Sequence, residues 1–311
     1  MIRLDPAVAQ ALAAGQPIVA LESALISHGL PPPSNLIVAR EAKARVEERG
    51  ARAAMIGIVS GQPVIGLRAE EVEVFAQGKG IEKTNSSNLA WVITRQAAGS
   101  TTVSASLTLA HRAGIRVFTT GGIGGVHRNV NETFDISSDL EAVARTPVVV
   151  VCWGAKAILD LSKTFEVLET LGVPVVGYRC DELPAFISRE SGIPLENSVG
   201  SPEELAALAH AHWQLGSRSA LLVVVPPPIG VALPRVALER AIEEALGESR
   251  RLHISGRQLT PFLLEQVDAL TGGRSRAANV ALILENAGVA AEIAKSLASG
   301  GPHPGPGSEK G

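Results

Sequence analysis

Residues 147–160 read PVVVVCWGAKAILD, and this stretch decides the fold that the sequence predicts. It opens with the unbroken apolar run 147–152, which is typical of a strand that is buried on both faces of a sheet. Apolar residues with helical spacing follow, so we expect a helix over 156–171. Outward from this unit, strand-like apolar runs alternate with helical segments in both directions. The alternation predicts a three-layer α/β/α fold with a mostly parallel central sheet.

The same patterns place the other elements. We expect strands at 17–21, 115–119, 174–177 and 220–225, and a hairpin that pairs 53–59 with 63–67. We expect helices at 34–48, 69–77, 89–98, 103–113, 138–145 and 203–215, and three more after residue 233. Residues 99–102, GSTT, are expected to break the chain between two of these helices.

Composition restricts the classes of partner. The chain has 311 residues, 46% of them hydrophobic, which is enough for one large α/β domain over residues 1–299. Its formal net charge of −3 provides no basic field for a phosphate backbone, so we expect no nucleic-acid partner. Residues 300–311, GGPHPGPGSEKG, lack apolar periodicity and are expected to form a disordered tail.

The sequence favours a cytoplasmic protein. No uninterrupted apolar run reaches the ~18 residues of a membrane span, so we expect no membrane partner. The N-terminal residues lack the basic start and the long apolar stretch of a signal peptide. Cys152 and Cys180 lie beside apolar runs, which indicates buried thiols rather than a disulfide framework.

Ligand-binding residues of α/β sheets gather just past the carboxyl ends of the strands. Glu22 follows the strand at 17–21, where partial burial would suit its carboxyl group to proton transfer, although a charged residue that merely ends a strand fits as well. Lys156 follows the run 147–152 and has apolar neighbours on both sides. A lysine kept from water is disfavoured as the ammonium ion and is available as a nucleophile. A lysine in a first helical turn, with its amine reaching water, is an equally good interpretation.

The segment 133–140, TFDISSDL, contains two acidic residues. Ser138 with Glu141 fits a capping box, and Asp139 in a first helical turn would favour the helix dipole. Asp135 has no such structural role, and a carboxylate there would suit a hard divalent metal such as Mn²⁺ or Mg²⁺.

The loop 121–125, GGIGG, contains the first two glycines of a dinucleotide-binding fingerprint. His127 occupies the position of the third glycine, so we do not expect a dinucleotide site. Backbone N–H groups of this loop, or those of the helix that begins after Thr102, could instead bind an anion.

These segments together resemble the pseudouridine-5′-phosphate glycosidase family over about residues 5–298. The matching stretches are ALES (20–23) with HG (28–29), GSTTV (99–103), TTGGIGGVHRN (119–129), TFDISSDL (133–140), TPVVVVCWGAKAILD (146–160), GVPVVGY (172–178), TPFLLEQV (260–267) and AANVALILENA (277–287). The resemblance implies an α/β/α fold and a homotrimer. It also implies an enzyme that reversibly cleaves the carbon–carbon bond of pseudouridine 5′-phosphate, giving uracil and ribose 5-phosphate.

The resemblance implies a role for each matching residue. Lys156 corresponds to the lysine that forms a covalent imine with C1′ of the ribose, Glu22 to the proton donor, and Asp135 to the ligand of Mn²⁺ or another divalent metal such as Mg²⁺. The positions that correspond to substrate-binding residues are Lys83, Thr102, Val103, His127, Ser137, Ser138, Asp139 and Asn279.

Two positions depart from the family pattern. The stretch after Lys83 reads TNSSN where relatives carry a more basic stretch, and Trp153 stands where a small residue is usual. Two other functions therefore stay open. One is a lysine-dependent lyase or glycosidase that acts on another sugar phosphate. The other is a non-catalytic nucleotide-binding protein with the same fold, although such a binder has no need of a reactive amine.

Overall fold

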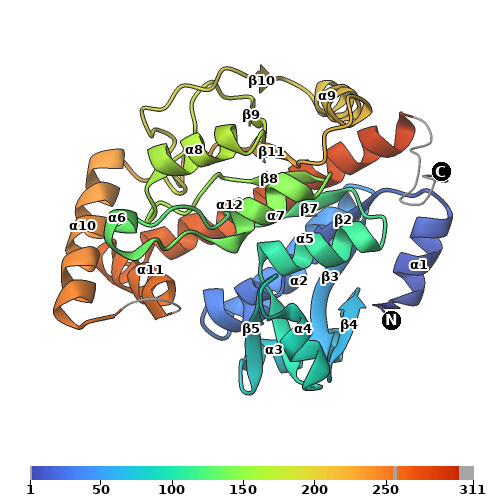
Figure 1. The fold of residues 1–311 in the computed structure, drawn as a ribbon, viewed down its shortest axis with the longest axis horizontal. Coiled ribbons are helices and arrows are strands. Elements are labelled where there is room, and N and C mark those ends of the chain that lie inside the picture. Colours follow the sequence, from blue (N-terminus) through green and yellow to red (C-terminus); the bar gives the residue numbers. More distant parts are fainter. Residues whose placement is uncertain (1, 255–257, 301–311) are drawn as a thin grey trace.

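The computed structural model describes residues 2–254 and 258–300 and shows a central sheet between two layers of helices (Figure 1). The sheet runs in the order β1-β4-β3-β2-β7-β8-β11-β9-β10, and β6, which pairs with β5, joins it at β3. The strands are β1 (Arg3–Leu4), β2 (Ile18–Leu21), β3 (Arg52–Val59), β4 (Gln62–Ile65), β5 (Ile81–Thr84), β6 (Ala98–Thr101), β7 (Val117–Thr119), β8 (Val149–Cys152), β9 (Val175–Tyr178), β10 (Ser198–Val199) and β11 (Leu221–Val224). Of the described strand pairs, β3–β4 and β3–β6 are antiparallel and the rest are parallel. The predicted fold class is confirmed.

Helices cover both faces of the sheet. The long helix α12 packs along α2 and α9 on one face, and α5 and α7 lie together on the other, with α8 beside α7. The helices are α1 (Pro6–Ala13), α2 (Ser34–Glu48), α3 (Ala69–Gln77), α4 (Leu89–Thr94), α5 (Val103–Arg112), α6 (Val130–Thr133), α7 (Ser138–Arg145), α8 (Leu161–Thr170), α9 (Pro202–Gln214), α10 (Arg235–Arg251), α11 (Leu259–Leu270) and α12 (Arg274–Ser299), with a π-helix η1 (Leu25–Gly29) after β2. The three helices expected after residue 233 and the 53–67 hairpin are confirmed.

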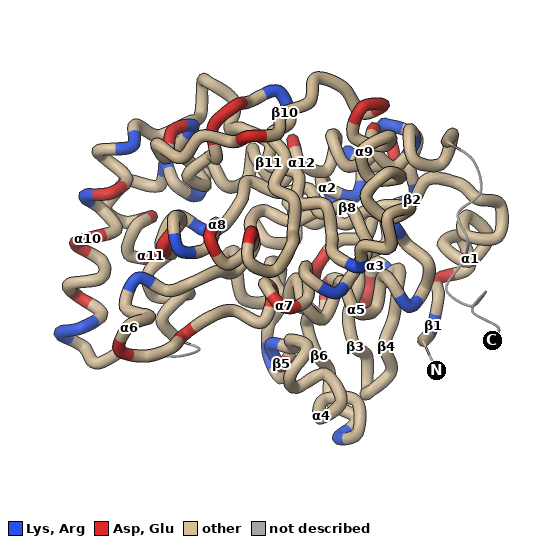
Figure 2. The backbone as a smooth tube through the Cα atoms, turned by 45° about the horizontal axis from the view of Figure 1, so that its top comes forward, with Lys and Arg blue, Asp and Glu red and all other residues tan. Residues whose placement is uncertain are grey.

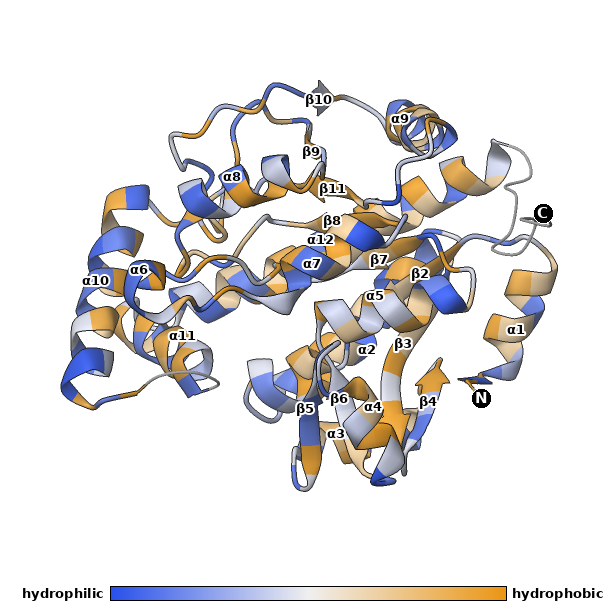
Figure 3. Ribbon diagram, in the orientation of Figure 1, coloured by the Kyte–Doolittle hydropathy of each residue, from blue (hydrophilic) through white to orange (hydrophobic). Residues whose placement is uncertain are grey.

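Charged residues of both signs are interspersed over the described chain rather than gathered on one face (Figure 2). The central strands β2, β8 and β11 are apolar at every position, and β7 is apolar up to its last residue, Thr119 (Figure 3). All four strands are buried along their whole length. Because helices cover both faces of the sheet, these strands carry apolar side chains on both faces, and the sequence shows runs instead of alternation.

The register of the central strands decides where the site forms. Leu21 at the end of β2 lies opposite Thr119 of β7, which lies opposite Val151 of β8. The chain segments that follow these three parallel strands therefore leave the sheet side by side. Residues that come after β2, β7 and β8 meet at one edge, although they are far apart in the sequence.

The helix expected over 156–171 is wrong in its first part, because α8 begins only at Leu161. Residues 153–160 form a loop in which Gly154 has a φ of +87°, and Asp160 caps α8 by accepting a hydrogen bond from the backbone N–H of Lys163 at 3.0 Å. Apolar residues in this loop are buried against the loop after β7, so their spacing resembled that of a buried helical face.

The region 89–102 also differs from the expectation. Helix α4 ends at Thr94, and the expected break contributes to strand β6. A Cβ at Gly99 would lie 2.4 Å from the Thr84 hydroxyl, so the pairing of β6 with β5 requires glycine there. Four-residue strands that contain glycine and hydroxyl groups give no apolar pattern, which is why β5 and β6 were not predicted.

Helix α12 is long and apolar enough, by length and composition, to cross a membrane. However, 61% of its most apolar window is buried inside the structure, where it packs on α2, α9 and β7. A core helix of a soluble protein is buried in this way. Of the tail expected at 300–311, residues 301–311 lie outside the described residues.

Both cysteines are free thiols. Burial raises the pKa of Cys152 to about 12 and that of Cys180 to about 11. Cys152 is buried as predicted, whereas Cys180 is half-buried. Both thiols therefore stay protonated and unreactive near neutral pH.

Candidate active site

One cavity of about 390 Å³ lies at the carboxyl edge of the sheet, where the segments after β2, β7 and β8 meet. All eleven residues to which the sequence assigned a role line this cavity: Glu22, Lys83, Thr102, Val103, His127, Asp135, Ser137, Ser138, Asp139, Lys156 and Asn279. The fold thus brings the whole predicted set together. The individual roles stay predictions.

Glu22 directly follows β2 and is half-buried in the cavity wall. The hydroxyl group of Thr120 donates a hydrogen bond to its carboxylate. Burial raises the pKa of Glu22 above its ordinary value, although the positive charge of Lys156 and the bond from Thr120 act in the opposite direction. A carboxyl group with a raised pKa keeps its proton closer to neutral pH, as a proton donor must.

A hydrogen bond from helix α12 fixes the backbone of Thr120. The side-chain amide of Asn286, which is fully buried, donates a hydrogen bond of 2.8 Å to the Thr120 carbonyl oxygen. The backbone N–H of Thr120 donates to Val151 in β8 at 3.1 Å. These bonds fix the residue that contacts Glu22 to both the sheet and the helix beneath it.

Lys156 lies in the loop 153–160, half-buried between the buried residues Ala155 and Ala157. Its backbone N–H donates to the Ile123 carbonyl oxygen at 3.2 Å, which ties this loop to the glycine loop. Its ammonium charge is close enough to lower the pKa of Glu22. The interpretation as a lysine in a first helical turn is wrong, because the helix begins five residues later. The loop instead holds the amine at the cavity.

His127 and Asp135 form a pair at the cavity wall. The backbone N–H of His127 donates to the Asp135 carbonyl oxygen at 3.1 Å, and the ring Nε2 lies 3.7 Å from the Asp135 carboxylate. Burial lowers the pKa of His127, although the Asp135 charge opposes this shift. Within residues 2–254 and 258–300, no cluster of three or more His, Cys, Asp or Glu side chains could hold a metal ion.

Hydroxyl groups gather where the N-termini of α5 and α7 meet. The hydroxyl group of Ser104, which is fully buried, lies 3.2 Å from that of Thr102 and 3.1 Å from that of Ser138. It also accepts a hydrogen bond from the backbone N–H of Ser86 at 3.2 Å. This arrangement makes one side of the cavity polar and suited to the hydroxyl and phosphate groups of a sugar phosphate.

The capping box predicted at Ser138 is wrong. Helix α7 begins at Ser138, and its cap is Ser137, whose hydroxyl group accepts a hydrogen bond from the backbone N–H of Asp139 at 3.2 Å. The Asp139 carboxylate accepts hydrogen bonds from the backbone N–H groups of Ser104 at 3.0 Å and Gly124 at 2.9 Å. Asp139 thus joins the glycine loop to α5, a role that its place in a first helical turn did not indicate.

Lys83 lies on β5 and is exposed at the cavity. Burial lowers the pKa of His28 and raises that of Glu22, and the positive charge of Lys83 adds to the first shift and opposes the second. Two residues from the non-basic stretch that follows it, Asn85 and Ser87, also line the cavity. This stretch therefore contributes neutral polar groups to the cavity.

Several lining residues had no assigned role: His28, Asn85, Ser87, Thr120, Phe186, Thr260, Pro261 and Leu264. His28, Thr120 and the three residues of α11 lie in the motifs that carry the family resemblance, so those motifs could have indicated them. Phe186 lies in an irregular loop between β9 and β10, where neither spacing nor a motif points to the cavity.

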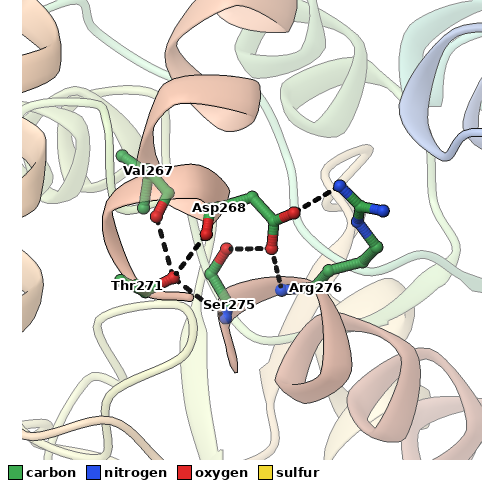
Figure 4. Close-up of polar contacts among 5 residues, drawn as sticks. All are labelled: Val267, Asp268, Thr271, Ser275 and Arg276. Atoms are coloured by element: carbon green, nitrogen blue, oxygen red, sulfur yellow. Dashed lines mark hydrogen bonds and ion pairs between the residues drawn. The ribbon is translucent and has the colours of Figure 1, made fainter. Parts of the chain in front are cut away.

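A polar junction sets the direction of α12 (Figure 4). The Asp268 carboxylate accepts hydrogen bonds from the hydroxyl group of Ser275 at 3.1 Å and the backbone N–H of Arg276 at 3.0 Å, and it pairs with the Arg276 guanidinium group. These bonds satisfy N–H and hydroxyl groups in the first turn of α12. Asn279, three residues beyond Arg276, is thereby held at the cavity.

The chain is similar to known proteins over nearly its whole length. The family model for indigoidine synthase A like protein matches residues 7–296. Pseudouridine-5′-phosphate glycosidase from Petrotoga mobilis is 46% identical over 296 residues, which are 95% of this chain and 97% of the relative. The protein of the same name from Arabidopsis thaliana is 45% identical over 298 residues, which are 96% and 90% of the two chains.

Two solved structures share the fold. The prealnumycin C-glycosynthase AlnA, in complex with ribulose 5-phosphate, superposes with a TM-score of 0.90 at 39% identity, covering 96% of this chain and 97% of that one. An indigoidine synthase A-like protein from Thermotoga maritima has a TM-score of 0.85 at 36% identity, covering 91% and 94%. The chain therefore belongs to the pseudouridine-5′-phosphate glycosidase family and is an enzyme of that type.

Proposed function

We propose that this enzyme reversibly cleaves the carbon–carbon bond of pseudouridine 5′-phosphate, giving uracil and ribose 5-phosphate. The observation that most supports this proposal is the position of Lys156 and Glu22. They face one cavity, close enough for their charges to interact, beside a hydroxyl-lined side that suits a sugar phosphate. The names of the relatives support the identity of the substrate.

The residue types suit a carbon–carbon bond. Uracil bound through carbon cannot leave as a nitrogen anion, so a pair of carboxylates of the ordinary glycosidase kind would not suffice. The Lys156 amine attacks C1′ while the Glu22 carboxyl group protonates the ring oxygen, which opens the sugar. The C5 of uracil takes up a proton and the bond to C1′ breaks, leaving C1′ as an imine on Lys156. Water then hydrolyses the imine, releasing ribose 5-phosphate and the free amine.

A divalent metal is part of the proposal, with Asp135 as its ligand. The carboxylate side chain of Asp135 is 36% exposed at the cavity, and the His127 Nε2 atom lies 3.7 Å from it. One carboxylate with water and substrate oxygens fits Mn²⁺ or Mg²⁺, which keep several bound waters, better than it fits a metal that needs a full protein cage. When bound, such an ion would orient and polarise oxygen atoms of the substrate.

Asp135→Ala is expected to raise the Mn²⁺ concentration for half-maximal activity by about tenfold or more, because it removes the only carboxylate proposed as a ligand. Titration of kcat/KM with Mn²⁺ measures this change, and Mn²⁺ binding followed by electron paramagnetic resonance reports it without turnover. Glu132→Ala, an exposed carboxylate in neighbouring α6, is the matched control. An unchanged activation curve for Asp135→Ala would remove Asp135 from the metal site.

Thr120→Val is expected to raise the pKa of Glu22 further, since valine cannot donate the hydrogen bond that stabilises the carboxylate. The proton donor would then stay protonated to higher pH, and the alkaline limb of the kcat/KM profile would move to higher pH. Thr94→Val, at an exposed threonine that donates only to the Trp91 carbonyl oxygen, is the control. An alkaline limb at the same pH in both variants would exclude an influence of Thr120 on Glu22.

The proposed function is tested by uracil release from pseudouridine 5′-phosphate in the presence of Mn²⁺. Uridine 5′-phosphate, in which nitrogen joins base and sugar, is the control substrate. We expect release from the first and much slower release from the second. If the folded enzyme releases no uracil, a lysine-dependent reaction on another sugar phosphate becomes the better interpretation, and trapping of Lys156 with candidate sugar phosphates would identify it.

We also propose, on the family resemblance, that the enzyme is a cytoplasmic homotrimer of single-domain subunits that span residues 1–299. Light scattering coupled to size-exclusion chromatography measures the mass of the assembly. A mass equal to one or two subunits would contradict the trimer.

A further inference from the structure

A second cavity, of about 380 Å³, adjoins the active-site cavity. The residues that line both cavities are His28, Gly29, Phe186, Pro261, Leu264 and Asn279. These residues therefore form a partition between the two spaces. Phe186 contributes the phenyl ring of the partition, and only 6% of this residue is exposed. None of the hydroxyl groups at the N-termini of α5 and α7 lines the second cavity, so the partition lies on another side of the active-site cavity.

The backbone holds the Phe186 ring in an unusual place. Phe186 lies in a tight turn that is closed by hydrogen bonds of 3.0 and 3.1 Å between Ala185 and Ser188. Its φ of +58° lies in the left-handed region, which bulky side chains rarely adopt. Such backbone conformations persist only where the surroundings enforce them, and they cluster at ligand-binding sites.

Trp153 supports the Phe186 ring from the core. The two rings meet edge to face, with 5.7 Å between their centroids and an interplanar angle of 71°. Trp153 is fully buried, and its indole N–H has no hydrogen-bond partner within the described part of the chain. Leaving a buried N–H unpaired is unfavourable, so the indole is retained for its shape and its contact with Phe186.

Two glycines allow the glycine loop 121–125 to approach this partition. A Cβ at Gly122 would lie 3.1 Å from the Phe186 ring, and a Cβ at Gly121 would lie 3.3 Å from the Asn279 side-chain oxygen. An aromatic ring and a carboxamide therefore lie beside consecutive residues of the loop. A flat ring with hydrogen-bonding groups along its edge matches this pair, because its face can stack on Phe186 and its edge can bond to Asn279.

We propose that Phe186, supported by Trp153, is the wall on which the planar base of the substrate stacks, and that it closes the active-site cavity to larger ring systems. The inference rests on the proposed function and extends it, because it assigns the base to the partition and the sugar phosphate to the hydroxyl-lined side. In this proposal Phe186 affects which base the enzyme binds, and it takes no part in proton transfer or in the making and breaking of bonds.

The test uses the condensation direction, in which the KM for uracil and the KM for ribose 5-phosphate are measured separately. Phe186→Ala is expected to raise the KM for uracil roughly 5- to 150-fold, the range for loss of one base–aromatic stack, while the KM for ribose 5-phosphate changes less than about twofold. Trp153→Phe, which keeps an aromatic core but withdraws the support, is expected to raise the KM for uracil by a smaller factor.

Phe186→Leu is a second variant for the case in which Phe186→Ala fails to fold. Leucine keeps an apolar side chain and removes only the flat face of the ring. Phe75→Leu, at a buried phenylalanine in the separate core cluster under η1, is the matched control and should leave both KM values unchanged. An unchanged KM for uracil in Phe186→Leu and Phe186→Ala, or an equal rise in both KM values, overturns the stacking wall. A wild-type enzyme that binds ribose 5-phosphate but forms no pseudouridine 5′-phosphate overturns the proposed function, and this inference with it.

Discussion

Lys156→Ala is expected to lower kcat for uracil release on the order of 10⁴- to 10⁶-fold, the range seen when a covalent nucleophile is removed. The physical reason is that no other amine of the described chain lines the cavity beside Glu22, apart from Lys83 on β5. Without covalent capture of C1′, the carbon–carbon bond has no route that avoids a free uracil carbanion. Steady-state uracil release measures the loss.

Two further variants separate the amine from its charge. Lys156→Arg keeps a positive charge near Glu22 but removes the nucleophile, so we expect it to be nearly as inactive as the alanine variant. Lys163→Ala is the control. This exposed lysine lies in the first turn of α8 and pairs with the capping residue Asp160, so the variant should keep full activity. Activity in Lys156→Arg comparable to that of the wild type would show that Lys156 acts only through its charge.

Chemical trapping locates the imine directly. Borohydride added during turnover reduces an imine to a stable amine, and peptide mass spectrometry should then find the sugar phosphate on Lys156. A label on Lys83 would reverse the roles of the two lysines. No label on either lysine, in an enzyme that still releases uracil, would contradict covalent catalysis.

Glu22→Gln is expected to lower kcat about 10²- to 10⁴-fold, the usual contribution of a positioned general acid. Glutamine keeps the size of the side chain and can still accept the hydrogen bond from Thr120, but it has no acidic proton to transfer to the ring oxygen. Burial raises the pKa of Glu22, and we expect its ionisation to end the activity of the wild type on the alkaline side, so the alkaline limb of the kcat/KM profile should disappear in this variant.

Glu48→Gln, at an exposed residue at the end of α2, provides the same chemical change away from the cavity and should leave the profile intact. A Glu22→Gln variant that retains more than about a tenth of the activity would assign proton donation to another group. An alkaline limb that persists in that variant would likewise show that Glu22 is not the group that titrates.

Much of the fold followed from the sequence, because the physical signal was local. The strands at 147–152 and 220–225 are apolar at every position because helices cover both faces of the sheet, and the helices 34–48 and 69–77 begin and end where predicted. The wrong predictions lie where the spacing of apolar residues along the chain did not indicate the true element. Apolar residues of 156–160 pack in a loop, and the short strands β5 and β6 contain too few apolar residues to be predicted.

The sequence by itself determined the fold class and the family, and through the family's motifs it determined which eleven residues to look for. Tertiary structure alone decided how they act together. Burial raises the pKa of Glu22 against the opposing hydrogen bond from a hydroxyl group 98 positions away, and the place of Lys156 depends on a loop tied to Ile123. Phe186 carries no sequence signal, because a strained turn and the Trp153 ring place it at the cavity. Contacts between distant segments set these properties, and such contacts leave no periodic pattern along the chain.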